Sequence, residues 1–218
     1  MHILITAGGT REYIDPVRFI TNASSGKMGY ALAGAAQKAG HKVTLISASD
    51  LQPPVGIEFV GVDSAAEMFE AVQKHFPRCD CLIMAAAVSD YAPVKQAKTK
   101  MKKTDKSLTI KLKPTADILK WAGKHKEKNQ IVAGFALEDR AIRTRAEKKL
   151  KEKNLDMIIA NTPAAIGVDK STVHIKTTSS SWTKIENADK TMIAGKIIRR
   201  LEKFSESAKD NKAQVAHH

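Results

Sequence analysis

Residues 2–29 read HILITAGGTREYIDPVRFITNASSGKMG, and most of the architecture is predicted from this stretch. Residues 2–7 are rich in aliphatic and β-branched side chains and run into small residues, which predicts a short buried strand. Residues 27–40, KMGYALAGAAQKAG, form an alanine-rich run that predicts a helix ending at Gly40. Between them lies a polar insertion of about 17 residues, and an insertion of this length between a strand and a helix is usually functional.

The elements predicted after Gly40 indicate a parallel sheet covered by helices. Strands are predicted at 41–48, 57–62, 79–88, 130–137, 155–161 and 172–178, and helices at 64–76, 140–153 and 189–204. The helix at 64–76 has Ser64 as its N-cap and Glu67 three residues later, the pattern of a capping box. We therefore expect a Rossmann-like α/β fold with a mostly parallel sheet and helices on both faces. We expect one domain over residues 1–204 and a polar, disordered tail over 205–218.

Residues 89–113 interrupt the alternation of strands and helices. Six lysines fall between Lys95 and Lys106, and the alternating run SLTIKLK follows at 107–113. This alternation predicts a strand with one buried face. We expect a lysine-rich flap and a strand arm over about 89–113. The lysines either close over a polyphosphate or form a solvated surface, and the sequence leaves both interpretations open.

The residues before the first helix resemble a phosphate-binding loop without completing one. Ser24, Gly26 and Gly29 follow the spacing of G-x-G-x-x-G with its first glycine replaced, and Gly26 with Lys27 matches the end of a P-loop. The long insertion replaces the direct strand-to-helix junction of a dinucleotide fold, which weakens that alternative. We expect the first helical turn to face another phosphate compound, with Gly26 permitting its close approach.

Four predicted strands end in small or polar residues, and their ends would meet at one edge of the sheet. These ends are Ala7–Thr10, Ala85–Ala87, Gly134–Ala136 and Ala160–Asn161. Ligands of open parallel sheets bind beyond the carboxyl ends of the strands, so we expect a ligand crevice at this edge. Tyr91 and Lys95 have the Y-x-x-x-K spacing of short-chain reductases. Pro93 lies between them, however, and disrupts the helix that this spacing requires.

The composition narrows the possible partners and location. A net charge of +13 favours anionic ligands, but 5% aromatic residues supply few stacking platforms for single-stranded nucleic acid. No apolar run approaches about 20 residues and no basic leader precedes the first strand, so we expect a cytoplasmic chain that binds neither membrane nor nucleic acid. Cys79 and Cys81 lack the spacing of a redox or zinc motif, and we expect reduced, half-buried thiols.

The motifs taken together resemble those of the phosphopantothenoylcysteine synthetase family. The matching segments run in order from about residue 3 to residue 203: ITAGGTREYIDPVRFITNASSGKMG, AAAVSDY, KTKMKK, GFALE, KKLKEKNLDMIIAN and KTMIAGKII. The resemblance implies a ligase of coenzyme A biosynthesis that joins 4'-phosphopantothenate to cysteine. In the bacterial type, the substrate carboxylate attacks the α-phosphate of CTP with Mg²⁺, and cysteine then displaces CMP from the acyl-cytidylate. Many members are fused behind a flavin-dependent decarboxylase; because the sequence begins at Met1, we expect a free-standing synthetase without flavin.

The resemblance also implies roles for individual residues. Asn22 is expected to act on the acyl-cytidylate, Lys100 to assist activation at the α-phosphate, and Arg18 to hold a substrate carboxylate or phosphate. Lys149 and Lys153 would bind the triphosphate, although the sequence equally allows them to pair with glutamates in solvent. The other expected nucleotide contacts are Gly26, Met84, Ala85, Ala86, Asp90, Ala116, Asp117, Ile118, Leu119 and Phe135. The family is dimeric, so we expect a homodimer joined partly by the arm, and the metal ligands stay unassigned.

Three segments depart from the bacterial motifs. Ala116 replaces a proline, Thr162 stands where an acid is usual, and GFALED at 134–139 replaces GFAAET. These changes leave the expected chemistry intact, but eukaryotic relatives use ATP, so the choice between CTP and ATP stays open. An NAD(P)-dependent reductase and a basic nucleic-acid-binding protein remain the alternatives from other functional classes.

Overall fold

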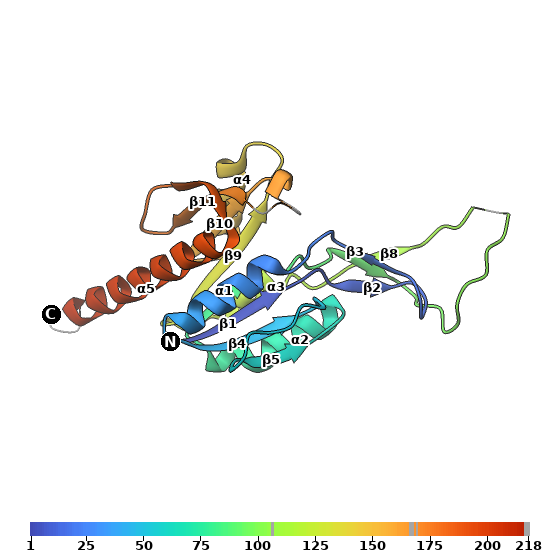
Figure 1. Ribbon diagram of the computed structural model, residues 1–218, viewed down its shortest axis with the longest axis horizontal. Coiled ribbons are helices and arrows are strands. Elements are labelled where there is room, and N and C mark those ends of the chain that lie inside the picture. Colours follow the sequence, from blue (N-terminus) through green and yellow to red (C-terminus); the bar gives the residue numbers. More distant parts are fainter. Residues whose placement is uncertain (106, 166–167, 169, 216–218) are drawn as a thin grey trace.

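An eight-stranded sheet forms the centre of the molecule (Figure 1). The computed structural model describes residues 1–105, 107–165, 168 and 170–215. The strands lie in the order β12-β11-β10-β9-β6-β1-β4-β5, parallel from β10 to β5 and antiparallel at β11 and β12. Their bounds are β1 His2–Ala7, β4 Lys42–Ser47, β5 Glu58–Gly61, β6 Cys81–Met84, β9 Ile131–Leu137, β10 Met157–Asn161, β11 Lys170–Thr177 and β12 Thr183–Asp189.

Helices cover both faces of the sheet, which confirms the predicted α/β class. α1 (Lys27–Lys38) and α5 (Lys190–Val215) pack on one face, and α2 (Ala65–His75), α3 (Ile118–His125) and α4 (Ile142–Glu152) pack on the other. β1 lies between the two layers, so its aliphatic side chains are buried on both faces, each contributing about 1.5–3 kcal/mol. In the part of the chain that the structure describes, no helix is both long and apolar enough to cross a membrane.

The packing of α1 on β1 depends on Gly29. A Cβ atom at this position would lie 2.4 Å from the Cβ of Ala7 and 3.0 Å from the carbonyl oxygen of Thr6. Only glycine therefore lets the helix approach the strand this closely. The close approach sets the start of α1 beside the carboxyl end of β1, at the edge where the ligand crevice is expected.

Two separate contacts cap the N-terminus of α2. The predicted capping box is confirmed, because Ser64 Oγ accepts a hydrogen bond from Glu67 N at 3.2 Å and Glu67 Oε2 accepts one from Ser64 N at 3.3 Å. The buried carboxylate of Glu12 accepts a third hydrogen bond from Ala65 N at 2.9 Å. A carboxylate at this end satisfies free N–H groups and complements the helix dipole. The contact also fixes the base of the polar insertion to α2.

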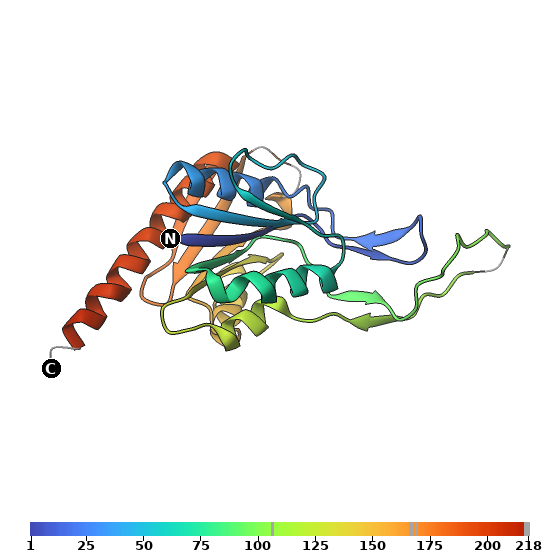
Figure 2. The ribbon, with the colours of Figure 1, turned by 90° about the horizontal axis from the view of Figure 1, so that it is seen from below.

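The polar insertion and the segment after β6 form two projections on the same side of the molecule (Figure 2). β2 (Arg11–Tyr13) and β3 (Phe19–Thr21) pair as an antiparallel hairpin. β7 (Tyr91–Pro93) and β8 (Leu112–Pro114) pair as a second short sheet, which lies against β2. The flap, defined as residues 94–105 and 107–111, joins β7 to β8 and extends beyond the hairpin (Figure 1).

The structure corrects two predicted boundaries and adds one strand of the central sheet that was not predicted. The strand predicted at 107–113 is confined to Leu112–Pro114, because residues 107–111 are mostly exposed and the alternating pattern has no buried face to stabilise a longer strand; the last hydrogen bond on this side of β7 runs from Val94 N to the carbonyl oxygen of Lys111 at 2.9 Å. α5 continues to Val215 rather than ending near Phe204, since residues 205–215 contain neither glycine nor proline. The end of the predicted tail, 216–218, lies outside the described residues. β12 has no clear strand pattern in the sequence, because only two of its residues are buried at the sheet edge.

The two cysteines are free and fully buried, not half-buried as expected. Burial raises the pKa of the Cys79 thiol to about 12 and raises that of Cys81 well above its usual value. A buried thiol that stays protonated is a poor nucleophile and a poor metal ligand. Both cysteines therefore serve the core, at the start of β6.

Candidate active site

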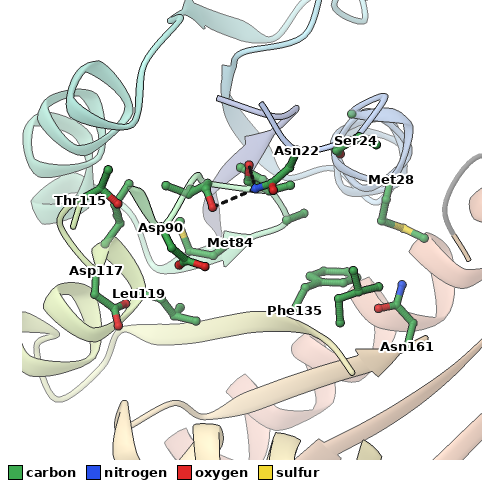
Figure 3. A pocket seen from close by; sticks show the side chains of 18 of the residues that line it. Asn22, Ser24, Met28, Met84, Asp90, Thr115, Asp117, Leu119, Phe135 and Asn161 are labelled. Atoms are coloured by element: carbon green, nitrogen blue, oxygen red, sulfur yellow. Dashed lines mark hydrogen bonds between the residues drawn. The ribbon is translucent and has the colours of Figure 1, made fainter. Parts of the chain in front are cut away.

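A cavity of about 560 Å³ opens at the carboxyl ends of β6, β9 and β10 (Figure 3). Its walls come from residues 22–28 before and within the first turn of α1, from residues 84–88 after β6, and from residues 115–119 at the start of α3. Side chains of β9, β10 and α4 complete it. The position is the one expected for ligands of an open parallel sheet, and the volume is typical of small-molecule sites.

The cavity brings together most of the predicted site residues from segments far apart in the sequence. Those that line it are Asn22, Gly26, Met84, Ala85, Ala86, Asp90, Ala116, Asp117, Ile118, Leu119, Phe135, Lys149 and Lys153. Their individual roles stay predictions. Ser24 and Thr115 also line it and were missed as contacts, and Asn161 was found only as a polar strand end. Thr115 carries no motif of its own, so only the three-dimensional structure could identify it.

Asn22 follows β3 and is held against the loop after β6. Its Nδ2 group donates hydrogen bonds to the carbonyl oxygens of Ala87 at 3.1 Å and Val88 at 3.2 Å (Figure 3). Both donor hydrogens of the amide are thus used. A carboxylate could not make either contact, so the position selects an amide over an acid.

The start of α1 faces the cavity with its free N–H groups. Gly26 is the N-cap, in the left-handed conformation with φ +77°, and no acidic residue lies in the first turn. A Cβ at Gly26 would lie 2.8 Å from Ser49 Cβ, so glycine is required here by backbone conformation and by contact with Ser49. The backbone thus gives a reason for the glycine that the sequence did not show, and the expectation that Gly26 permits close approach of a ligand stays a prediction. The helix end remains suited to an anion.

Lys149 of α4 and Lys153, the C-cap of that helix, supply positive charge to the cavity. Lys149 Nζ donates a hydrogen bond to the carbonyl oxygen of Phe135 at 2.8 Å, and burial, followed by the nearby Lys153 charge, lowers its pKa. Lys153 Nζ lies 2.7 Å from Asp117 Oδ2. The two ammonium groups, one helical turn apart, suit a bound polyphosphate.

The alternative that these lysines pair with glutamates in solvent is wrong. Lys148 pairs with Glu152 at 3.7 Å, and Lys151 pairs with Glu147 at 3.6 Å, on the exposed side of α4. The helix thus separates its lysines into a solvent-facing set and a cavity-facing set. Only the second set is placed to meet a ligand in the cavity.

Two carboxylates give the cavity hydrogen-bond acceptors. Asp117 caps α3 by accepting a hydrogen bond from Lys120 N at 3.0 Å. Burial opposes its ionisation, but the hydrogen bonds from Lys153 and from Lys120 N hold the pKa of Asp117 below its usual value. Thr115 N donates to the carbonyl oxygen of Asp90 at 2.9 Å, and the Asp90 side chain points into the cavity (Figure 3). Ionised carboxylates accept hydrogen bonds from hydroxyl and amino groups, such as those of a sugar or base.

Arg18 and Lys100 do not line the cavity of their own chain. Arg18 lies in the turn of the β2–β3 hairpin, where it pairs with Asp15 at 2.5 Å and donates to the carbonyl oxygen of Met101 at 2.6 Å. Lys100 precedes Met101 in the flap. The hairpin carries Arg18, and the flap carries Lys100, away from the cavity, so neither lies against a ligand bound in the cavity of its own chain. The expected contact of Arg18 with a substrate stays a prediction, and in this structure its guanidinium group binds Asp15 and the flap main chain.

Sequence comparison places the chain among known proteins. The family described as "DFP: DNA/pantothenate metabolism flavoprotein C-terminal domain" matches residues 1–204. The chain belongs to this family. Among DFP relatives, the coenzyme A biosynthesis bifunctional protein CoaBC of Bacillus subtilis is 52% identical over 168 residues, covering 76% of this chain and 41% of the relative. A cysteine/cysteine sulfinic acid decarboxylase from an unknown prokaryotic organism is 43% identical over 205 residues, covering 91% of this chain and 57% of the relative.

A solved DFP structure has the same architecture. The crystal structure of the C-terminal domain of CoaBC is 40% identical, with a TM-score of 0.83, and the match covers 94% of this chain and 96% of that domain. The chain spans about half the length of the two curated relatives described above. The comparison is therefore with one domain of longer proteins, and it favours neither a reductase nor a nucleic-acid-binding protein.

Proposed function

We propose that the chain is a phosphopantothenate–cysteine ligase of coenzyme A biosynthesis. One observation carries the proposal: in a chain closely similar to the C-terminal part of CoaBC, a single cavity is bordered by Asn22, the start of α1, two lysines and two carboxylates. The helix end and the lysines suit a triphosphate, and the carboxylates suit a sugar or base. A nucleotide is the small molecule that carries all of these groups.

The proposed reaction has two steps. The carboxylate oxygen of 4'-phosphopantothenate attacks the α-phosphorus of the nucleoside triphosphate, the bond to the bridging oxygen breaks, and pyrophosphate leaves. The amine of cysteine then attacks the acyl carbon, the nucleoside monophosphate leaves with the former carboxylate oxygen, and the amine loses a proton as the amide forms. Activation is needed because a free carboxylate resists an amine until one oxygen becomes a good leaving group.

The residues of the chain would supply position and charge. The start of α1, Lys149 and Lys153 would neutralise the triphosphate, and Asn22 would act on the acyl-nucleotide at the junction of hairpin and β6 loop. Mg²⁺ would arrive with the nucleotide, as it commonly binds through substrate phosphates. Binding of the metal through the nucleotide agrees with the described residues, which contain no cluster of three or more His, Cys, Asp or Glu side chains able to hold a metal. The reaction itself uses no flavin.

CTP is the proposed nucleotide, because the motifs resemble the bacterial type. Purified chain with Mg²⁺ should release pyrophosphate only when both a nucleotide and 4'-phosphopantothenate are present, and should release it faster with CTP than with ATP. The amide product should form only after cysteine is added. If neither nucleotide gives pyrophosphate above background, the ligase assignment fails; a dinucleotide-dependent absorbance change would instead support a reductase, and steeply salt-dependent oligonucleotide binding a nucleic-acid-binding protein.

We also propose that two copies of the chain associate through the projections. Exposed apolar side chains gather on the hairpin, on the β7–β8 arm and at the start of the flap: Val17, Phe19, Tyr91, Leu112 and Val94. Apolar groups gathered on neighbouring projections favour a protein interface over solvent. Sedimentation velocity at micromolar concentration should give the mass of a dimer. A monomer that persists across the concentration range, in a sample active in the pyrophosphate assay, would reject the dimer and leave the ligase assignment intact.

A further inference from the structure

The carboxylate of Asp15 is surrounded by hydrogen-bond donors. Oδ1 accepts hydrogen bonds from Val17 N and Arg18 N, both at 2.9 Å. Oδ2 accepts hydrogen bonds from Arg18 Nε at 2.9 Å, Arg18 Nη2 at 2.5 Å and Met101 N at 3.1 Å. Its side chain is buried, and the hydrogen bond from Arg18 holds the pKa of Asp15 well below its usual range. At neutral pH the carboxylate is thus charged, and both of its oxygens accept hydrogen bonds.

Asp15 and Arg18 together hold one peptide segment of the flap. Met101 N donates to Asp15, and the carbonyl oxygen of Met101 accepts from Arg18 Nη2 at 2.6 Å, so both polar groups of this residue are bound. Ala97 N adds a hydrogen bond to the carbonyl oxygen of Ile14 at 2.9 Å. In the described part of the flap, these are the hydrogen bonds that join it to the rest of the molecule.

A role in the turn alone does not explain this arrangement. The turn itself uses Oδ1, which binds the two main-chain N–H groups of residues 17 and 18. Oδ2 and the arginine reach across to a segment more than 80 residues later in the sequence. Charged partners make such hydrogen bonds about twice as strong as neutral ones. The bound residue, Met101, directly follows Lys100.

We propose that Asp15 is a positioning residue for the flap, acting with Arg18 to hold the main chain at Met101 and so to fix the place of Lys100. We call Asp15, Arg18 and Met101 the latch. The inference rests on the proposed ligase function, in which Lys100 assists activation at the α-phosphate. It also rests on the proposed dimer, because Lys100 does not line the cavity of its own chain and would act at the cavity of the second copy. It assigns Arg18 a second task, because in this arrangement its guanidinium group binds the flap main chain.

The test compares two substitutions that each weaken an arginine–aspartate pair. Asp15→Asn removes the charge that binds Met101 N and Arg18. Asp50→Asn is the matched control, because Asp50 lies 2.5 Å from Arg11 Nη2 near the same hairpin, is exposed and has no contact with the flap among the described residues. Arg18→Gln serves as a second latch variant, in case Asp15→Asn fails to fold.

Amide hydrogen exchange and steady-state kinetics are measured on all four proteins. Exchange at Met101 should be about tenfold to 100-fold faster in Asp15→Asn than in the wild type, and unchanged in Asp50→Asn. The kcat of pyrophosphate release should fall by about tenfold or more in Asp15→Asn, while the Kd of the nucleotide stays within about twofold. Loss of a purely structural contact would instead change the free energy of unfolding. It would not lower kcat while leaving the Kd of the nucleotide unchanged.

Each other outcome has a definite meaning. Equal exchange at Met101 in Asp15→Asn and the wild type would reject the latch. Faster exchange with an unchanged kcat would reject its role in positioning Lys100. If the wild type itself releases no pyrophosphate, the ligase function fails and the catalytic part of the inference fails with it, whereas the exchange comparison still decides whether the latch holds the flap.

Discussion

Replacing Asn22 with Asp is expected to lower the rate of product formation by about 10²- to 10³-fold while the fold is retained. Asn22 Nδ2 donates to the carbonyl oxygens of Ala87 and Val88, and a carboxylate at this position would face both oxygens with a negative charge. The amide would no longer be held beside the acyl-nucleotide. Rapid-quench experiments with labelled nucleotide should show the acyl-nucleotide accumulating, or its use stopping, with no amide formed.

Asn161→Asp is the control for added charge. Asn161 lines the same cavity from β10 and, among the described residues, makes no hydrogen bond to the loop after β6. This substitution adds the same negative charge, so the loss of nucleotide affinity that it causes measures the charge effect alone. Normal turnover in Asn22→Asp, or an equal loss in both variants, would remove Asn22 from the mechanism.

Replacing Lys149 with Met is expected to weaken binding of the nucleoside triphosphate by about tenfold to 100-fold. Lys149 is largely shielded from solvent and its charge faces the cavity, so its attraction for a phosphate is little screened. Binding of the nucleoside monophosphate should weaken less, because the monophosphate carries fewer negative charges that interact with Lys149. Isothermal titration calorimetry with both nucleotides measures the difference.

The control for Lys149→Met is its neighbour in the sequence, Lys148→Met. Lys148 pairs with Glu152 on the solvent side of α4, so its loss should leave nucleotide affinity unchanged. Because the pKa of Lys149 is lowered, binding by the wild type should weaken as pH rises through that value, and Lys149→Met should lose this alkaline decline. Equal affinities in the two variants would contradict a role for Lys149 in binding the triphosphate.

The sequence predicts the sheet and its helices well where local patterns are strong. The capping box at Ser64 and Glu67 and the apolar run that becomes β6 are local signals, and both are found in the structure. β12 was missed because an edge strand buries few side chains, and its pairing with β11 depends on a partner that local patterns do not identify.

The candidate site was predictable where each motif lies next to a strand end or helix start. Met84 to Ala86 and Gly26 are such positions, and they line the cavity. Arg18 and Lys100 were assigned by resemblance, and their surroundings depend on a contact between segments more than 80 residues apart. Lys149 and Lys153 are four residues apart, and so are Lys148 and Glu152, which pair in solvent. Spacing alone therefore does not tell which lysines face the cavity, and only the packing of the helix decides it.

The hydrogen bond between Glu12 and Ala65 N has a consequence for how the molecule unfolds. It makes the base of the β2–β3 hairpin part of the cap of α2, and Arg11 N adds a hydrogen bond to the carbonyl oxygen of Asp63 at 2.8 Å. Opening the hairpin would therefore leave the first turn of α2 with an unsatisfied N–H group. Although the hairpin reaches into solvent, we expect it to unfold in the same cooperative unit as the helix beside the sheet.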